Sequence, residues 1–322
     1  MLARVHPADR AVWLILVAAV GVCVLRLPAT GRALVPWLVL HVSLAALYTA
    51  YLALAAVREA RWVSHLLRPA VNVGVVFTLY STLGRLGLAA MPHADAALSW
   101  ADAHLLALPP LALERVQTAR LVEVCAVPYA LFIPYIYLSA ALGTFGRPPV
   151  ERDAFLTGWM LTYATSYVGY LLLPAEGPVG FHAAEYLGPL QGGPVYDLVQ
   201  RGVAATGGNF GAFPSLHVGS SLYLCVFDLK TNRLRGLTYL PVVVSIYAAT
   251  LVLRFHYAID LVAGTLIALV CVRMGPEYLY RWMRARVARG LAPLPGEDPH
   301  AVLGLPPVGD DRAPGVLPAH RG

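Results

Sequence analysis

The sequence predicts an all-α fold, a polytopic membrane bundle of about eight transmembrane helices. The 322-residue chain is 58% hydrophobic and 13% charged, and its mean hydropathy is +0.63. These values exclude an ordinary soluble domain and a disordered chain. A hydrocarbon core about 30 Å thick needs about 20 apolar residues per helix, so each apolar run can be compared with that length.

Eight apolar runs approach or exceed the length of a membrane span. They are residues 11–27, 33–57, 69–88, 120–142, 154–173, 214–229, 237–253 and 255–274. The first run follows Arg4 and Arg10, as a signal peptide would, but no convincing small-residue cleavage site comes after it. We therefore expect it to be a retained helix.

The distribution of basic residues predicts the orientation of these helices. One set of alternate connections holds most of them: Arg4, Arg10, Arg58, Arg61, Arg68, Arg147, Arg152, Lys230, Arg233, Arg235, Arg273, Arg281, Arg284, Arg286 and Arg289. By the positive-inside rule that side is cytoplasmic and includes both termini. The formal net charge of +6 fits this topology and attraction to anionic headgroups, and does not indicate nucleic-acid binding.

Two segments on the opposite, extracytoplasmic side interrupt the helices. Residues 89–118 mix leucines with Trp100, Asp95 and Asp102, which is typical of an amphipathic helix at the membrane interface. Residues 174–213 are rich in glycine and proline, and a loop of this length is usually functional. Its carboxylates Glu176 and Asp197 could bind a polar acceptor, although solvated loop carboxylates are commoner.

Two histidine motifs follow the second of these segments. Ser215 lies two residues before His217, and Asp260 lies four residues after His256. Both motifs belong to the extracytoplasmic ends of predicted helices, where ionisable groups are costly and usually functional. This set of residues suits a phosphoryl-transfer site that requires no metal and no cofactor. The four cysteines lie far apart in predicted spans, without metal or disulfide spacing.

A histidine can attack phosphorus and form a phosphohistidine, which water or an alcohol then resolves. We expect His256 to be this nucleophile. Positions i and i+4 share a helix face, so Asp260 would accept a hydrogen bond from one ring nitrogen and leave the other free. His217 would protonate the departing lipid alcohol and then act as a base toward the incoming acceptor.

Several backbone and side-chain groups beside His217 could bind the phosphate. Pro214 suits the first turn of a helix, so the amides of residues 215–217 would be unpaired and available to an anion. Ser215 adds a hydroxyl donor, and Gly211 permits close approach of the backbone. Arg254 would supply a positive charge.

Two segments resemble the second and third signatures of the type 2 phosphatidic acid phosphatase (PAP2) superfamily: Phe213-Pro-Ser-Leu-His217 and His256-Tyr-Ala-Ile-Asp260-Leu-Val-Ala-Gly264. The longer strings from Gly211 to His217 and from Thr250 to Tyr257, with Tyr170-Leu-Leu-Leu-Pro174, are more similar to the inositol phosphorylceramide synthase-like branch. The resemblance covers about residues 154–272. It implies a metal-independent lipid phosphatase or phosphotransferase.

The chain departs from the family pattern at its phosphate-binding cations. Thr250 stands six residues before the nucleophile, where the phosphatases usually carry arginine. The formal match to the first signature, Arg61-Trp-Val-Ser-His-Leu-Leu-Arg68-Pro69, lies three predicted spans away on the opposite membrane face, so we exclude it from the site. The missing cations would then come from Arg201, Arg120 or Arg85, among which the sequence does not choose.

The sequence leaves the acceptor open. If water resolves the intermediate, the protein is a lipid phosphate or polyprenyl diphosphate phosphatase; if a polyol or lipid alcohol does, it is a phosphotransferase. A transporter or an inactive scaffold would instead distribute polar residues through the midplane of several helices. We expect three regions: N-terminal helices (1–150, with the interfacial segment at 89–118), a PAP2-like catalytic core (151–275), and a basic, then Pro- and Gly-rich, disordered cytoplasmic tail (276–322).

Overall fold

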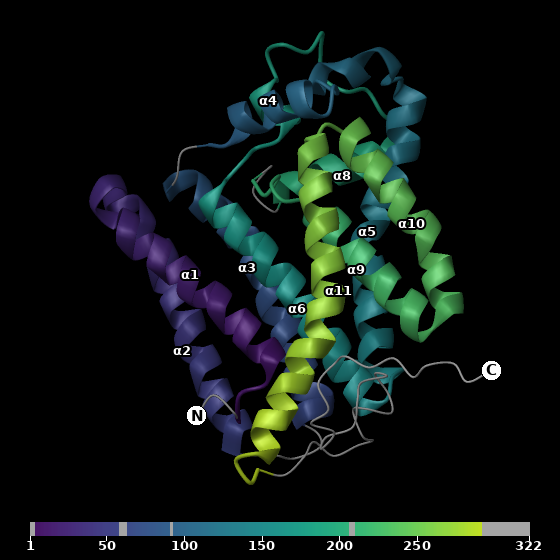
Figure 1. The fold of residues 1–322 in the computed structure, drawn as a ribbon. Helices are drawn as coiled ribbons and strands as arrows, with labels where there is room; N and C mark the ends of the chain where they lie inside the picture. The colour runs from purple at the N-terminus through teal and green to yellow at the C-terminus, as the bar shows by residue number, and fades with distance from the viewer. Residues whose placement is uncertain (1–3, 58–62, 91–92, 206–209, 292–322) are drawn as a thin grey trace, which may run out of the picture.

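The computed structural model describes residues 4–57, 63–90, 93–205 and 210–291 (Figure 1). Within those ranges the chain is helical and contains no β-strand, which confirms the all-α class. The long helices are α1 (Pro7–Thr30), α2 (Val35–Val57), α3 (Arg68–Ala90), α5 (Ala119–Phe145), α6 (Pro149–Leu172), α9 (Leu216–Thr231), α10 (Arg233–Val252) and α11 (Ala258–Val287). Shorter elements are η2 (Gly31–Leu34), the π-helix η3 (Val63–Leu67), α4 (Asp95–Leu105), η4 (Pro110–Val116), α7 (Pro178–Phe181) and α8 (Pro194–Ala205).

Each of the eight apolar runs coincides with one long helix, but eight membrane crossings are not confirmed. Five stretches are long and apolar enough to cross a bilayer: Pro7–Ala56, His65–Leu83, Ala119–Phe145, Arg233–Val252 and Ala258–Val287. The first contains both α1 and α2, which lie side by side in Figure 1. The pair α4 and η4, bent by 71°, would be a sixth. Helix α9 has only 16 residues, and α6 is rich in threonine and tyrosine.

Helix α6 forms the centre of the bundle, where it packs against α1, α3, α9 and α11. Its polar side chains are buried but hydrogen-bonded: the Tyr167 hydroxyl donates to the Val76 carbonyl at 2.7 Å, and the Trp159 indole donates to Ser220 at 2.9 Å. Such pairing lets a helix of mixed polarity lie inside a membrane protein.

Charged pairs connect the helix ends that the sequence predicts to be cytoplasmic. Asp9 at the start of α1 accepts a hydrogen bond from Arg68 at the start of α3, at 3.2 Å. Asp228 near the end of α9 pairs with Arg147, which follows α5, and with Arg235 at the start of α10. The starts of α9 and α11 lie at the other end of the bundle, beneath α4 at the top of Figure 1. Arg68 of the formal first signature is therefore paired far from both histidine motifs.

The expected region boundaries differ from the packing. Residues of α1 and α3 share one hydrophobic core with α6, α9 and α11, so residue 150 does not separate two packing units. Helix α11 continues to Val287, beyond the expected limit at residue 275. The greater part of the expected tail, residues 292–322, lies outside the described residues.

Candidate active site

The two histidine motifs meet because α9 and α11 approach each other closely at two glycines. A Cβ atom added at Gly264 would lie 2.4 Å from the Ser215 carbonyl oxygen, closer than real Cβ atoms approach oxygen. Gly219 belongs to the same contact: a Cβ atom added there would lie 3.3 Å from the Gly264 carbonyl oxygen. The Ser215 amide also donates to the Asp260 carbonyl at 3.1 Å. The first turns of the two helices are thus in direct contact.

The tautomer of His256 is set by a backbone carbonyl. Its Nδ1 lies 2.8 Å from the carbonyl oxygen of Ala212. A carbonyl can only accept a hydrogen bond, so Nδ1 carries the proton and Nε2 keeps its lone pair. The side chain is 4% exposed, and burial lowers the pKa of His256 to about 4, although the hydrogen bond to Ala212 opposes this shift. At neutral pH the ring is uncharged and nucleophilic at Nε2.

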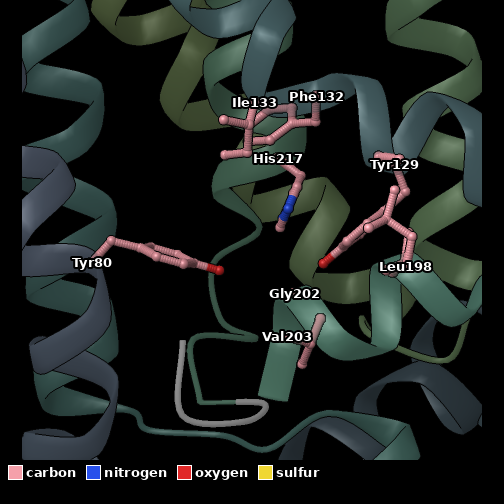
Figure 2. A pocket seen from close by; sticks show the side chains of 10 residues that line it. Tyr80, Tyr129, Phe132, Ile133, Leu198, Gly202, Val203 and His217 are labelled. Carbon is pink, nitrogen blue, oxygen red and sulfur yellow. The ribbon is translucent and has the colours of Figure 1, made fainter. Parts of the chain in front are cut away.

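His217 faces this lone pair from the start of α9. Its Nδ1 lies 3.4 Å from His256 Nε2, and the ring centroids are 5.6 Å apart. Rings of α5 hold His217 from the other side, with centroid distances of 4.7 Å to Tyr129 and 4.4 Å to Phe132 (Figure 2). The structure therefore brings together the predicted nucleophile and the predicted acid.

Asp260 reaches His256 by a different geometry from the one that its spacing predicts. His256 is not helical, because α11 begins at Ala258 with Tyr257 as its N-cap. The Asp260 carboxylate accepts from the Tyr257 amide at 2.8 Å and lies 3.3 Å from His256 Nδ1. The prediction that both residues share a helix face is wrong, and the Ala212 carbonyl is the shorter partner of the imidazole.

The expected role of the segment before α9 also changes. Pro214 lies before the helix, after a cis peptide bond, and Ser215 is the N-cap. The Ser215 hydroxyl accepts from the Val218 amide at 3.4 Å, its own amide is bonded to Asp260, and its side chain is fully buried. A helix with Pro214 in its first turn and a free Ser215 amide is therefore not what the chain forms.

Gly211 lines the same cavity as both histidines, near the end of the segment 174–213. It pairs with Ala175 in an isolated β-bridge, and the Ala212 amide donates to the Ala175 carbonyl at 3.2 Å. A Cβ atom at Gly211 would lie 2.9 Å from the ring of Tyr170, so a larger residue would displace that ring or the backbone at residue 211. This bridge holds the Ala212 carbonyl where His256 needs it.

Arg254 lies in the loop before His256, but its guanidinium is bound by residues of the segments 89–118 and 174–213. It donates to Gln117 Oε1 at 2.8 Å and to the Gly188 carbonyl at 3.1 Å, and pairs with Glu114 at 3.4 Å. It also stacks 3.6 Å over the ring centroid of Tyr186. The residue has a positive φ of 61°, and its carbonyl accepts from the Val179 amide.

The other candidate cations are not gathered at the histidines. Arg201 on α8 and Arg120 on α5 are exposed, and neither lines the cavities beside His217. The side chain of Arg85 lies outside the part of the structure that can be described. Among the described residues, Arg254 is the cation that shares a cavity wall with His256.

Two carboxylates of α4 contact residues 257–259 at the start of α11 and were not among the predicted site residues. Asp102 accepts from the amides of Ala258 and Ile259 at 2.7 and 2.8 Å, and so caps α11 from a separate helix. Asp95 accepts from the Tyr257 hydroxyl at 3.0 Å. Both are buried, and burial raises the pKa of Asp102 against the lowering effect of its two amide donors.

Sequence patterns offered one signal for these carboxylates. Asp95 and Asp102 are seven residues apart, so they share one face of a helix. The sequence predicts an amphipathic helix at the interface here, but nothing in the local sequence indicates a partner more than 150 residues away.

Two connected cavities adjoin His217. The larger has a volume of about 300 Å³ and is mainly apolar, with walls from α3, α5 and α8 (Figure 2). The smaller, about 40 Å³, reaches His256, Gly211 and Glu176. Both share Tyr80, Tyr129, Val203 and His217. Within the described ranges no three His, Cys, Asp or Glu side chains are grouped as metal ligands.

Comparisons with known proteins agree with the two motifs. The sequence profile of the PAP2 superfamily matches residues 96–274, more than half of the chain, from α4 into α11. A PA-phosphatase related-family protein of Dictyostelium discoideum is 28% identical over 128 residues, which are 38% of this chain and 23% of that protein. The chain thus matches about a quarter of the length of this relative. No solved structure matches significantly. Neither match distinguishes the inositol phosphorylceramide synthase-like branch.

Proposed function

Because the chain belongs to the PAP2 superfamily, we propose that it cleaves or transfers a phosphoryl-containing group of a membrane lipid through a phosphohistidine intermediate. The observation that carries this proposal is the pairing of His256 Nε2 with His217 Nδ1 at 3.4 Å, with the other His256 nitrogen bound to the Ala212 carbonyl. This arrangement would supply a neutral nucleophile, His256, and an acid, His217, whose rings face each other.

In the first step His256 Nε2 attacks phosphorus, the bond from phosphorus to the lipid oxygen breaks, and His217 protonates that oxygen. An attacking nitrogen approaches to about 3–3.5 Å, and an acid needs about 2.6–3.2 Å to its oxygen. The 3.4 Å contact between the rings must therefore widen when the phosphate enters. In the second step His217 removes a proton from water or an alcohol, whose oxygen displaces Nε2.

The larger cavity supports a lipid as the leaving group. Its apolar walls include Ile133, Leu198 and Val203, and it opens beside His217 (Figure 2). The acyl or prenyl chain of a membrane lipid could lie against these walls without leaving an apolar environment. This placement puts the lipid oxygen next to the proposed acid.

The field at the start of α9 would favour the phosphate, whereas the Ser215 and Val218 amides of that turn are already bonded within the protein. Arg254 lines another cavity with His256 and is paired with Glu114. Its contacts would hold the loop that carries His256 against residues 114–117 and 188. Both steps use His256 and His217, and neither requires a metal ion.

We further propose that the site faces the extracytoplasmic side, with both termini cytoplasmic. The support is the excess of basic residues on the connections at the opposite end of the bundle. The resemblance to the inositol phosphorylceramide synthase-like branch favours an alcohol as acceptor; hydrolysis of a lipid phosphate or a polyprenyl diphosphate uses the same residues.

The proposal predicts that His256→Ala abolishes turnover of lipid phosphates in EDTA. The purified chain in detergent would be incubated with phosphatidic acid and a polyprenyl diphosphate, with and without glycerol or myo-inositol. Loss of the nucleophile should lower kcat by about 1,000-fold or more. His104→Ala is the matched control, because His104 is exposed and bonded to its own helix. Equal turnover by wild type and His256→Ala would disprove the mechanism, and no turnover by either would favour a transporter or scaffold.

A further inference from the structure

Helix α8 forms one wall of the apolar cavity beside His217. Four of its residues line that cavity: Leu198, Val199, Gly202 and Val203. Their spacing of one and four positions places them on one face of the helix. Figure 2 shows Gly202 and Val203 beside the space that His217 borders. A lipid whose oxygen lies next to the proposed acid would therefore have part of its chain against α8.

Gly202 leaves a gap in this wall. A Cβ atom added at Gly202 would have no atom of the described residues within 4 Å. Neither a close approach nor a positive φ therefore requires glycine at this position. Glycine is the weakest helix former after proline, so its presence inside α8 does not favour the helix. Its effect on the cavity is to make it wider.

The position of α8 is fixed by a carboxylate on α5. Glu123 accepts hydrogen bonds from the amides of Gly193, Val195 and Tyr196 at 2.7, 2.9 and 3.0 Å. Pro194, the first residue of α8, has no amide hydrogen. One carboxylate thus bonds the amide donors on both sides of this proline, and its charge is favoured by the helix dipole.

Packing supports the same contact between α5 and α8. A Cβ atom at Gly193 would lie 2.8 Å from the carboxyl carbon of Glu123, so glycine lets the carboxylate approach. On the buried side of α8, Tyr196 and Val199 belong to one apolar cluster with Val122 of α5. Helices α5 and α8 both line the cavity, and these contacts hold the two walls at a fixed separation.

We propose that α8 determines which lipid chains the cavity accepts: Gly202 provides the width for a branched hydrocarbon chain, and Glu123 holds α8 at that width. The inference rests on the proposed function and adds a specificity-determining residue and a positioning residue. Methyl branches make a chain wider than a straight chain of equal length. A side chain at position 202 would therefore clash with the branched chain first, and such a clash discriminates between lipids that share a headgroup.

The test compares dipalmitoyl and diphytanoyl phosphatidic acid, which have the same headgroup and main chains of equal length and differ in the methyl branches. Release of diacylglycerol by the full-length protein in detergent gives kcat/KM for each lipid. The wild type should turn over both. We expect Gly202→Leu to lower the value for the branched lipid by about 10- to 100-fold and that for the straight lipid by less than about threefold, as small changes of bulk in an apolar pocket do. Gly202→Ala should have an intermediate effect.

Gly74→Leu is the matched control. Gly74 is also a helical glycine with open space at its Cβ position, but it belongs to α3 and does not line the cavity. Leucine forms helices more readily than glycine, so both leucine variants should fold. Thermal unfolding measured in parallel checks this expectation.

Glu123→Gln tests the role of the carboxylate. The amide loses the charge and one acceptor oxygen, so α8 should be held less firmly. We expect KM for the straight lipid to rise by about 3- to 10-fold while kcat changes less than about twofold. In the double variant with Gly202→Leu, the loss for the branched lipid should be smaller by about threefold or more, because a looser α8 can yield to the added side chain. Asp197→Asn is the control, since it removes an exposed charge from the first turn of α8 without removing the bonds to Glu123.

An equal effect of Gly202→Leu on both lipids would overturn this inference, as would no effect, or a wild type that rejects the branched lipid. The same loss in Gly74→Leu would also overturn it, and an unchanged loss in the double variant would remove Glu123 from it. Competition binding of the two lipids to His256→Ala, with and without Gly202→Leu, measures the same preference without turnover. Release that does not depend on His256 would remove the proposed function, whereas the binding preference would still decide the role of α8.

Discussion

At His256, the chemistry depends on which ring nitrogen holds the proton. The Ala212 carbonyl and the Asp260 carboxylate both face Nδ1, at 2.8 and 3.3 Å. The side chain immediately precedes the N-cap of α11, so its orientation comes from the loop before the helix and from the Ala212 segment 44 residues earlier. A carboxylate four residues later could suggest the pair, but the carbonyl that sets the tautomer has no sequence signature.

The lowered pKa of His256 predicts how activity depends on pH. The nucleophile is the uncharged ring, which exists above the folded-state pKa of about 4. In kcat/KM for a lipid phosphate, the decrease that reflects protonation of His256 should therefore be centred near pH 4, not at the usual value of about 6.5. The profile of His104→Ala should be the same. A fall centred at about 6.5 would indicate a solvated imidazole and contradict the buried geometry.

The same shift has a consequence for stability. Between about pH 6.5 and 4 the unfolded chain binds a proton on this histidine that the folded chain does not bind. The free energy of unfolding therefore falls as the pH is lowered through that window, and it is restored as the pH rises.

At the level of elements, α4 fixes the position of residues 257–259, the start of α11 that directly follows His256. It lies across the end of the bundle (Figure 1) and presents Asp95 to Tyr257 and Asp102 to the first two amides of α11. A helix N-terminus leaves such amides without partners inside the helix, so a carboxylate from another element can fix where the helix begins. Asp102 is thus a positioning residue for His256.

We expect Asp102→Asn to lower kcat by about 10- to 100-fold while KM changes less than about twofold. The neutral amide replaces two charge-assisted hydrogen bonds, each of which contributes about 1.5–3 kcal/mol, so α11 and the turn before it would shift. Asp197→Asn on the exposed face of α8 is the control. Thermal unfolding measured in parallel separates this effect from misfolding. Wild-type kcat in folded Asp102→Asn protein would show that α4 does not position the site.

For the whole molecule, the polar groups divide between two ends. The histidines and α4 lie at one end, and the ion pairs of Asp9 and Asp228 lie at the other. In a bilayer both sets would be close to an interface, where charged groups cost less than at the midplane. The alternation of basic connections predicts that the ion-paired end faces the cytoplasm.

This topology predicts the labelling of two introduced cysteines. Leu187 in the outer loop is 95% exposed, and Leu234 at the start of α10 is 76% exposed. In intact cells a membrane-impermeant maleimide should label Leu187→Cys, and it should label Leu234→Cys only after lysis. The four native cysteines are buried, so background labelling should be low. The reverse pattern would place the site on the cytoplasmic side.

The sequence by itself determined the helices and the two motifs from which the chemistry is proposed. Hydropathy acts locally, so every apolar run coincides with a helix. By length and composition, five stretches of the described residues are candidate membrane spans, where the sequence predicts about eight. The residues proposed as nucleophile, acid and carboxylate could likewise be selected from short-range spacing, and the structure brings them together. Two predictions were wrong: that Pro214 lies in the first turn of α9 and that His256 is helical. Local spacing does not reveal where tertiary contacts make a helix begin.

Only the tertiary structure decided what surrounds those residues. Contacts between distant segments made Ala212 the partner of His256, engaged Arg254 with Glu114, and brought the carboxylates of α4 to the start of α11. The physical reason is that a buried donor or acceptor must find a partner wherever the packed chain supplies one. Packing at Gly264 allows α9 and α11 to come close enough for these partners to meet, and the order of residues along the chain does not specify them.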